Sequence, residues 1–490
     1  MTLLDRRQLL HGSAAAAAAA GLSPLGRTAR LRSGSPNEEL RVACVGVRGR
    51  GRSHMHGFQR LKGVEVVALV EVDSEVGSER RAELEKLRGG ARVDLYEDIR
   101  EVLDRDDIDA VSLATPNHLH ALHGIWACQS GKHVYVEKPV SHNVFEGRQL
   151  VRAAERYGRV VQCGTQARSS PGIGQAIAWL HEGHLGEVRA ARGICFKRRP
   201  SIGNVTTPRE VGAHVNWDLY CGPAPLEPLR RENLHYDWHW QFETGNGDLG
   251  NQGVHQMDLA RWAIGASGLC RGVGAFGARL GYSDDGDTPN SMVVLLDYEQ
   301  APILFEVRGL PRSSSSGDAP GEMDQHDGMS IGVTVECEGG RLRIPHRAPP
   351  MALDLDGREM ARWSEGGDDH FANFIEAVRA NDPGVLEGGI LEGHLSSALC
   401  HLGNASYRVG ARRSADAIRR ELGANQLARE GVDRLDEHLR SNGLDIKGDV
   451  LTFGPYLEVD LEAERFRHDE LANALLTRSY RAPFIVPEEV

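Results

Sequence analysis

The sequence predicts an α/β protein: an N-terminal Rossmann domain with a doubly wound parallel sheet, then a second α/β domain with a mostly antiparallel, open sheet. Two patterns predict this fold. Up to residue 163, apolar runs alternate with amphipathic stretches, which is typical of parallel strands joined by helices. From residue 271 onward, strand-like runs follow one another closely, which is typical of antiparallel strands.

The composition is that of a soluble globular protein with a substantial core. The chain has 490 residues, of which 40% are hydrophobic and 26% are charged, so we expect two or three domains. The formal net charge of −12 argues against binding to nucleic acid or to an anionic membrane. The eight cysteines are scattered without a CxxC pair, which favours neither a zinc site nor a disulfide framework. We therefore expect no metal.

The first 37 residues are predicted to be a targeting signal and a linker. Arg6 and Arg7 precede an alanine-rich run over 13–21, which resembles a twin-arginine export signal. The alanines Ala14–Ala20 are too few to span a bilayer, which needs about 20 apolar residues. The signal predicts a periplasmic or secreted protein, and a disordered tail with a chance Arg-Arg pair is the alternative. No Ala-x-Ala cleavage site follows, so both a released and a tethered protein stay open.

Residues 41–73 have the order of a dinucleotide-binding unit. A short apolar strand leads into the Gly-rich turn Gly46–Gly51, then a helix over 54–61 and a second strand that is followed by Glu71. In such units the glycines let the backbone approach a pyrophosphate, and a carboxylate about 20 residues later binds the ribose. Because that carboxylate would repel a 2′-phosphate, Glu71 favours NAD over NADP.

One position departs from the dinucleotide-binding pattern. Gly46 and Gly51 occupy the first and third glycine positions, but Arg48 stands at the second. In our interpretation Gly49 relieves the crowding and a nearby arginine adds positive charge near the phosphates; an ordinary Gly-rich turn is the alternative. The candidate arginines are Arg48, Arg50 and Arg52.

Two loops with unusual residues follow the next strands of the predicted parallel sheet, at 115–120 and 137–139. Ligands bind at the carboxyl ends of parallel strands, so we expect both loops to face the nicotinamide. Lys138 is a candidate proton donor or acceptor if burial lowers its pKa. Glu137 is expected to orient the lysine or to form an ion pair. A solvated turn is the alternative for these two residues.

A glycine-rich turn over 245–250 leads into a helix that we predict to begin at Asn251. Steps of four and three residues place Asn251, His255, Asp258 and Trp262 on one face of this helix. Asp258 is predicted to hold the His255 imidazole in one tautomer and make it a competent base. A histidine satisfied within the core is the alternative.

Many aromatic residues stand between 217 and 242. They indicate either loop packing or stacking platforms for the C–H face of a sugar. The predicted substrate-binding residues are Arg168, Trp240, Asn251 and His255.

These patterns divide the chain into four parts: signal and linker over 1–37, NAD-binding Rossmann domain over 38–165, substrate and oligomerisation domain over 166–425, and a helical C-terminal extension over 426–490. We expect the extension to wrap the body or a neighbouring subunit. Strands are expected over 41–46, 65–71, 92–96, 110–115, 133–137 and 159–163 in the first sheet, and over 187–196, 271–281, 291–298, 302–310, 331–337 and 341–345 in the second. Helices are expected over 174–183, 369–379 and 391–408.

Four of these motifs together resemble the Gfo/Idh/MocA family of oxidoreductases. The resemblance rests on Val42–Gly51, 115–118, 137–139 and Gly250–Asp258, and covers about residues 40–410. It implies bound NAD(P), a sugar or cyclitol substrate, and an open sheet that makes oligomer contacts. The predicted catalytic residues are Lys138, Asn251, His255 and Asp258, of which the resemblance identifies Lys138 and His255. The predicted cofactor contacts are Gly46, Arg48, Gly49, Arg50, Gly51, Glu71, Thr115, Pro116, His118, Glu137 and Lys138.

The sequence departs from the family pattern at Asn251. The resemblance implies an aspartate at this position, four residues before the family histidine. An asparagine side chain can hydrogen-bond a hydroxyl but cannot accept its proton, so Lys138 and His255 would handle the proton alone. Asp248 is a candidate to compensate.

Three functions are compatible with these residues. The first is an NAD-dependent oxidoreductase that moves a hydride between a sugar or cyclitol carbinol carbon and the nicotinamide, with Lys138 and His255 relaying the proton. The second is an NAD-retaining enzyme that cleaves a glycoside by transient oxidation and elimination. The third is a non-catalytic sugar-binding protein, which Arg48 and Asn251 favour.

Overall fold

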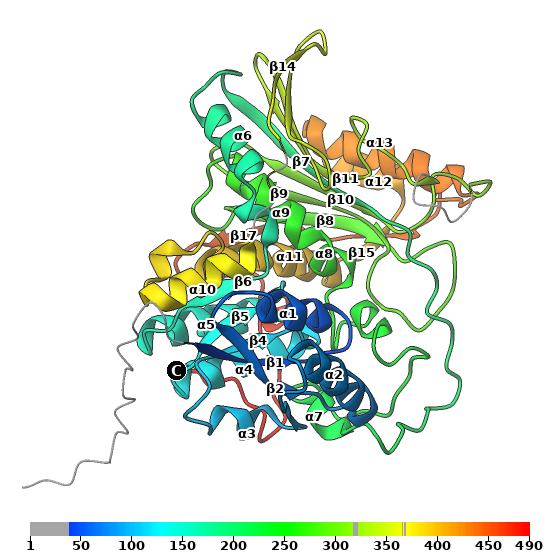
Figure 1. Cartoon of the computed structure of the whole chain (residues 1–490). Helices are drawn as coiled ribbons and strands as arrows, with labels where there is room; N and C mark the ends of the chain where they lie inside the picture. Colours follow the sequence, from blue (N-terminus) through cyan, green and yellow to red (C-terminus); the bar gives the residue numbers. More distant parts are fainter. Residues whose placement is uncertain (1–38, 317–321, 365, 367–368) are drawn as a thin grey trace, which may run out of the picture. The chain divides into compact units, whose positions relative to one another are not determined.

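Two β-sheets organise the computed structural model (Figure 1). The structure describes residues 39–316, 322–364, 366 and 369–490. The predicted twin-arginine signal and linker over 1–37 therefore lie outside the described residues.

The first sheet has six parallel strands in the order β3-β2-β1-β4-β5-β6. This is the Rossmann order, and it confirms the predicted doubly wound parallel sheet. Apart from the edge strand β3, the strands are mostly buried on both faces, as parallel strands between helices are. The strands are β1 Leu40–Val45, β2 Val64–Val70, β3 Asp94–Tyr96, β4 Ala110–Leu113, β5 His133–Val136 and β6 Val161–Cys163. The helices are α1 Arg50–Gln59, α2 Ser74–Leu87, α3 Ile99–Leu103, α4 Asn117–Gln129 and α5 Val144–Arg156.

The second sheet is mostly antiparallel, as predicted, and only β7 and β10 run parallel as neighbours within it. Its strand order is β14-β13-β12-β11-β7-β10-β9-β8-β16-β15, with β17 also pairing with β8. The sequence pattern predicted β7 to β12 but not the outer strands. The strands are β7 Val188–Phe196, β8 Gly272–Ala278, β9 Ser291–Asp297, β10 Ile303–Arg308, β11 Ile331–Cys337, β12 Gly340–Pro345, β13 Met351–Asp354, β14 Glu359–Arg362, β15 Ala411–Arg413, β16 Leu451–Phe453, β17 Leu457–Asp460 and β18 Arg465–Phe466.

Helix α11, Ile390–Arg408, joins the two sheets. It contacts α5 and β6 of the Rossmann domain and also α9 and β8 of the second domain, and α10 and α11 lie between the two sheets in Figure 1. Nearly all of its side chains are buried for this reason. The other helices of this part are α6 Pro171–His181, α7 Trp217–Cys221, α8 Gly247–Asn251, α9 Gly253–Ala263 and α10 His370–Ala380.

The prediction of a helical extension over 426–490 is wrong beyond Ser441. Helix α13, Gln426–Ser441, packs Val432, Leu435 and Leu439 with α12, Ala415–Glu421, against β8, β9 and β10. The chain then adds β16 and β17 to the second sheet, forms α14, Glu470–Ala474, and continues without regular structure to Val490. The extension therefore covers the body of its own chain.

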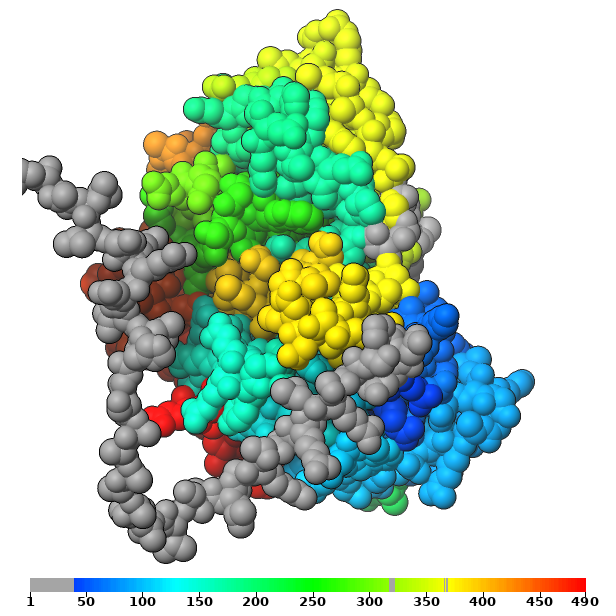
Figure 2. Space-filling model, turned by 60° about the vertical axis from the view of Figure 1, so that its left-hand side comes forward, coloured from blue at the N-terminus to red at the C-terminus, as the bar shows by residue number. Residues whose placement is uncertain are grey.

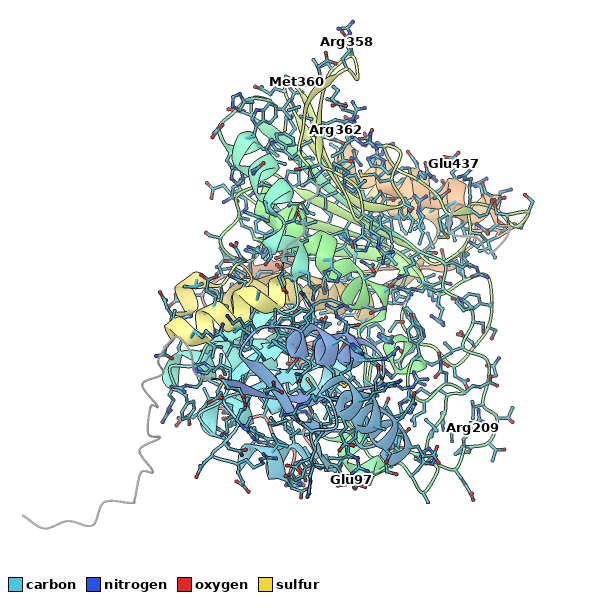
Figure 3. All side chains as sticks on the ribbon, in the orientation of Figure 1. Glu97, Arg209, Arg358, Met360, Arg362 and Glu437 are labelled. Carbon is cyan, nitrogen blue, oxygen red and sulfur yellow. The ribbon has the colours of Figure 1, made fainter. Side chains whose placement is uncertain are left out.

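The β13–β14 hairpin is the most exposed part of the second sheet, and it stands at the top of Figure 2. Its side chains Arg358, Met360 and Arg362 point away from the Rossmann sheet in Figure 3. In the part of the chain that the structure describes, no helix is long and apolar enough to cross a membrane.

Candidate active site

A cavity of about 880 Å³ lies at the carboxyl ends of the Rossmann strands. It extends from the start of α3 past the Gly-rich turn to α9, where His255, Gln256 and Leu259 line it, and to the turn after β12. Such a position is the usual ligand site of an open α/β sheet. The cavity therefore joins the two predicted halves of the site.

The Gly-rich turn needs glycine at two of its positions. Gly46 has a φ of +74°, and a Cβ on Gly51 would lie 1.7 Å from the Gly46 carbonyl oxygen. Gly49 is different, because a Cβ there would meet nothing within 4 Å and the residue lines the cavity. Arg48 also lines the cavity and is exposed, so the arginine at the second glycine position does not disturb the turn.

The predicted ribose carboxylate also holds the Gly-rich turn in place. Glu71 accepts hydrogen bonds from the backbone N–H groups of Val47 at 2.8 Å and Asp73 at 3.2 Å. Burial raises the pKa of Glu71, and these N–H groups oppose the rise. The side chain still lines the cavity. Glu71 thus couples the shape of the turn to the ribose end of the site, a role that the sequence did not indicate.

Glu137 forms the predicted ion pair, and its partner is Arg50. The Arg50 Nε lies 2.7 Å from Glu137 Oε1, and His54 Nε2 lies 3.0 Å from the same oxygen. Burial alone would raise the pKa of Glu137, but Arg50 and His54 hold it well below its usual value. Arg52, by contrast, pairs with Glu83 on the surface and is absent from the cavity lining.

Lys138, Asn251 and His255 meet at the other end of the cavity. The Lys138 ammonium donates to the backbone carbonyl oxygen of Asn251 at 2.5 Å. Burial lowers the pKa of Lys138, although the Glu137 carboxylate opposes this effect. Burial and the Lys138 charge lower the pKa of His255 well below its usual value. The site therefore favours a neutral imidazole beside an amine that loses its proton more readily than usual.

The predicted contact between Asp258 and His255 is wrong. Asp258 accepts from Arg168 Nε at 2.8 Å and from Ser396 Oγ at 2.7 Å, and it is only 1% exposed. Both residues lie in α9, Gly253–Ala263, but the Asp258 carboxylate is bound by these two partners while His255 lines the cavity. The predicted single helix from Asn251 is also interrupted, because Asn251 ends α8 and α9 begins at Gly253. The residues of this segment that line the cavity are Asn251, Gln252, His255, Gln256 and Leu259.

Four further predicted residues lie outside the cavity lining. Gly51 is buried beside the Gly46 carbonyl oxygen. Arg168 pairs with Asp258 and Glu392, and the two ring nitrogens of His118 lie within hydrogen-bond distance of the carbonyl oxygens of Thr244 and Tyr220. Trp240 is buried beneath the Arg199 guanidinium. Asp248 does not replace the missing carboxylate, because it is paired with Arg199 on both oxygens.

The cavity also holds side chains that the sequence did not single out. Trp238 and His239 line it from the aromatic segment, in place of Trp240, and His346 and Arg347 enter from the turn after β12. The cluster of aromatic residues over 217–242 correctly indicated that this segment contributes to the site. The spacing of these residues did not show which ring faces the cavity. Nothing in the local sequence marked His346 or Arg347.

Polar atoms along the cavity fit a dinucleotide. Thr115 Oγ1, Asn117 Nδ2 and His123 Nδ1 are buried and have no hydrogen-bond partner among the described residues, and all three residues line the cavity. Helix α1 begins at the Gly-rich turn without a side-chain cap, so its first N–H groups are available to a phosphate. These groups, with Glu71, match the donors and acceptors that NAD requires.

Residues 40–165 match the model of the Gfo/Idh/MocA proteins, described as an oxidoreductase family with an NAD-binding Rossmann fold. The Rossmann part of the chain is thus similar to the Gfo/Idh/MocA family. The Gfo/Idh/MocA match includes the Gly-rich turn, Glu71 and Lys138, and it stops before Asn251 and His255.

Curated relatives match part of the chain. A levoglucosan dehydrogenase of Pseudarthrobacter phenanthrenivorans is 28% identical over 171 residues, which are 34% of this chain and 36% of that protein. A glycosyl hydrolase family 109 protein of Shewanella sp. strain ANA-3 is 41% identical over 127 residues, 25% of this chain and 28% of that protein. The matched part of the chain thus spans about a third or less of the length of these two relatives.

Solved structures extend the likeness in fold to most of the chain. The WlbA dehydrogenase from Bordetella pertussis, solved with NADH and UDP-GlcNAcA, has a TM-score of 0.55 at 21% identity and covers 76% of this chain and 97% of its own. Levoglucosan dehydrogenase, solved with NADH and levoglucosan, has a TM-score of 0.55 at 17% identity and covers 75% of this chain and 96% of its own. At these identities the likeness shows the fold alone.

Proposed function

We propose that the protein is an NAD-dependent oxidoreductase that transfers a hydride between a hydroxyl-bearing carbon of a sugar or cyclitol and the nicotinamide. One observation carries the proposal: Lys138 and His255 line the same cavity as the Gly-rich turn and Glu71. Proton-transferring groups and a dinucleotide site in one cavity are what dehydrogenation of an alcohol requires.

The chain's own residues supply binding and orientation. When NAD is bound, its nicotinamide ring supplies the hydride acceptor at C4. The Gly-rich turn and the N-terminus of α1 would hold the pyrophosphate, and Glu71 would bind the ribose hydroxyls. The Glu137–Arg50 pair fixes the start of the loop that carries Lys138.

Lys138 and His255 handle the proton of the reacting hydroxyl. The neutral amine of Lys138 would accept this proton as the hydride leaves the carbon, and its lowered pKa makes that form more accessible. The neutral imidazole of His255 would hydrogen-bond the same or a neighbouring hydroxyl. The Asn251 side chain can orient a hydroxyl but cannot take its proton.

Reduction of NAD by a panel of polyols and sugars tests this proposal. We expect Lys138→Met to lower the turnover number by about 100-fold or more while NAD still binds. Arg358→Ala is the matched control, since Arg358 is at the tip of the β13–β14 hairpin, away from the Rossmann sheet (Figure 3). A protein that binds NAD and reduces none with any polyol would contradict the proposal.

A second candidate is cleavage of a glycoside with retained NAD. The 41% identity over 127 residues to a glycosyl hydrolase family 109 protein favours it. In this reaction the hydride would leave the sugar, the aglycone would be eliminated after loss of a proton, water would add to the resulting double bond at the anomeric carbon, and the hydride would return to the ketone. Release of nitrophenol from nitrophenyl glycosides without net NAD reduction would identify this activity.

The remaining parts of the proposal concern location and partners. The Arg6-Arg7 motif supports export to the periplasm or the medium. We also propose a homo-oligomer that binds no nucleic acid, as the net charge of −12 favours. Because α13 covers one face of β8, β9 and β10, a subunit contact would use the strands on the other side of β7, which are β11 to β14. Light scattering on the purified protein would measure the number of subunits.

A further inference from the structure

One end of the cavity is lined by Phe484 from the C-terminal segment of the chain. The Glu71 backbone N–H donates to the Tyr96 carbonyl oxygen at 2.9 Å, which places the start of α3 next to the predicted ribose carboxylate. This end lies away from Lys138 and His255, so it is where the adenine base of a dinucleotide would lie. Its lining residues are Glu97, Asp98, Ile99, His123, Trp126, Leu219 and Phe484.

Phe484 comes from the last part of the chain and is 2% exposed. Its ring lies 6.3 Å from the ring of Trp126 on α4. Two guanidinium groups lie over it, Arg481 at 4.8 Å and Arg100 at 5.7 Å. Aromatic and cation–π contacts of this kind hold a ring in a fixed orientation. These contacts fix the Phe484 ring as part of the cavity wall.

The segment over 475–490, which we call the C-terminal strap, is anchored on both sides of Phe484. Before the ring, Arg481 donates to the Asp218 side chain at 2.5 Å and to the Gly222 carbonyl oxygen at 3.1 Å. After the ring, Gln149 on α5 donates to the Pro487 carbonyl oxygen at 2.8 Å. In Figure 2 the red C-terminal residues accordingly lie against the cyan part of the Rossmann domain.

His123 adds a polar atom to this end of the cavity. Its ring stacks on Trp126 at 5.8 Å, the residue is only 8% exposed, and Nδ1 has no hydrogen-bond partner in the described part of the chain. Burial lowers the pKa of His123 to about 3. A neutral imidazole nitrogen in an aromatic corner can hydrogen-bond the edge of a purine ring while the neighbouring rings contact its faces.

We infer that the C-terminal strap is part of the cofactor site: Phe484, Trp126 and His123 bind the adenine of NAD, and the strap slows its release so that the cofactor stays with the protein between turnovers. This inference rests on the NAD binding in the proposed function. It also assigns a role to the chain beyond residue 475, for which the sequence offered none.

The test measures NADH binding and release with the full-length protein, by nicotinamide fluorescence. We expect Phe484→Ala to raise the dissociation rate and the dissociation constant by about tenfold. Ile485→Ala is the matched control, because Ile485 is the next residue and is 51% exposed. Phe484→Trp, which keeps an aromatic ring, should restore slow release.

A second measurement on the unmodified protein guards against a variant that fails to fold. Hydrogen–deuterium exchange over 475–490 should slow when NAD is added, because the bound adenine contacts the strap. Release rates equal for Phe484→Ala and Ile485→Ala, or exchange unchanged by NAD, would overturn the inference while leaving NAD binding intact. A protein that binds no NAD at all would instead contradict the proposed function.

Discussion

At the scale of single residues, Lys138 shows how surroundings set reactivity. The ammonium group is held against the Asn251 carbonyl oxygen, and burial lowers its pKa in spite of the nearby Glu137 carboxylate. That carboxylate is itself paired with the Arg50 guanidinium and hydrogen-bonded by His54. The lysine therefore lies beside a negative charge whose field is largely cancelled, and desolvation decides its pKa.

This balance predicts the pH dependence of turnover. A base must be deprotonated to act, so the rate of alcohol oxidation should rise with pH through the pKa of Lys138, at a midpoint below the usual 10.5. Arg50→Met should move that midpoint upward, because an uncompensated Glu137 carboxylate stabilises the charged amine. The pH profile of the turnover number measures this, and a midpoint that Arg50→Met leaves unchanged would disprove the proposed balance.

Glu71 predicts a change in cofactor preference. Glu71→Gln keeps an oxygen that can accept from the Val47 N–H group but removes the charge that repels a 2′-phosphate. We expect the ratio of NAD to NADP affinity to fall by about tenfold. Titration of both cofactors measures it, with Glu75→Gln as a control on an exposed neighbouring carboxylate. An unaltered ratio would place the ribose away from Glu71.

At the scale of structural elements, the Gly-rich turn predicts that replacing glycine by alanine destabilises the fold at Gly51 but not at Gly49. Gly51→Ala would place a Cβ 1.7 Å from the Gly46 carbonyl oxygen, whereas Gly49→Ala would meet nothing within 4 Å. We expect Gly51→Ala to lower the free energy of unfolding by about 1 to 3 kcal/mol and to weaken NAD binding. Gly49→Ala should leave the stability unchanged. Equal stabilities in urea denaturation would contradict this account of the turn.

The turn between β17 and β18 ties the C-terminal extension to the Rossmann domain. Glu464 accepts from Arg148 Nε and lies near His394 Nε2, both at 2.9 Å. Burial alone would raise the pKa of Glu464, but these partners lower it to about 2. A glutamate in an unfolded chain has a pKa of about 4.3. The Glu464 carboxylate therefore stabilises the folded state above that pH, and this stabilisation is lost as the pH falls toward about 2.

The pH dependence of stability should therefore change in Glu464→Gln. We expect this variant to lose about 2 kcal/mol of unfolding free energy at about pH 7, and the difference from the parent protein to shrink as the pH falls through about 4 to 2. Denaturant titrations at several pH values measure it. Glu437→Gln on the exposed side of α13 (Figure 3) is the control, and a pH-independent loss in Glu464→Gln would contradict the ionic account.

At the scale of the whole molecule, both domains and the C-terminal segment line one cavity. The Rossmann strands supply the dinucleotide end, α9 and the turn after β12 supply the other end, and Phe484 of the C-terminal strap lines the proposed adenine side. Slow release of the cofactor would suit the proposed export, because an exported protein would meet little free NAD.

Export is tested by the signal itself. Replacing Arg6-Arg7 by Lys-Lys should keep the protein in the cytoplasm, because twin-arginine export requires the arginine pair. Fractionation of cells expressing the two forms measures this, and replacing Arg27 and Arg30 by lysine serves as a control for changing two arginines elsewhere in the segment. Unchanged export would identify the first 37 residues as something other than this signal.

The sequence by itself determined the elements and the local motifs. Alternating apolar runs predicted all six Rossmann strands, and the spacing of Gly46, Gly51 and Glu71 predicted the dinucleotide unit, because these features depend on residues close together in the chain. Lys138 was identified for the same reason, since it follows a strand whose carboxyl end must face the ligand.

Only the tertiary structure decided the partners of the polar residues. Asp258 pairs with Arg168, 90 residues earlier, and with Ser396, 138 residues later, and not with the nearby His255. Likewise Trp238 lines the cavity while Trp240 lies beneath Arg199, and Phe484 reaches the far end of the cavity from the C-terminal strap. The helical period shows which residues share a face of a helix, but it does not show which other element packs against that face. Burial and charge pairing depend on contacts between elements that are distant in the chain, so only the tertiary structure determines them.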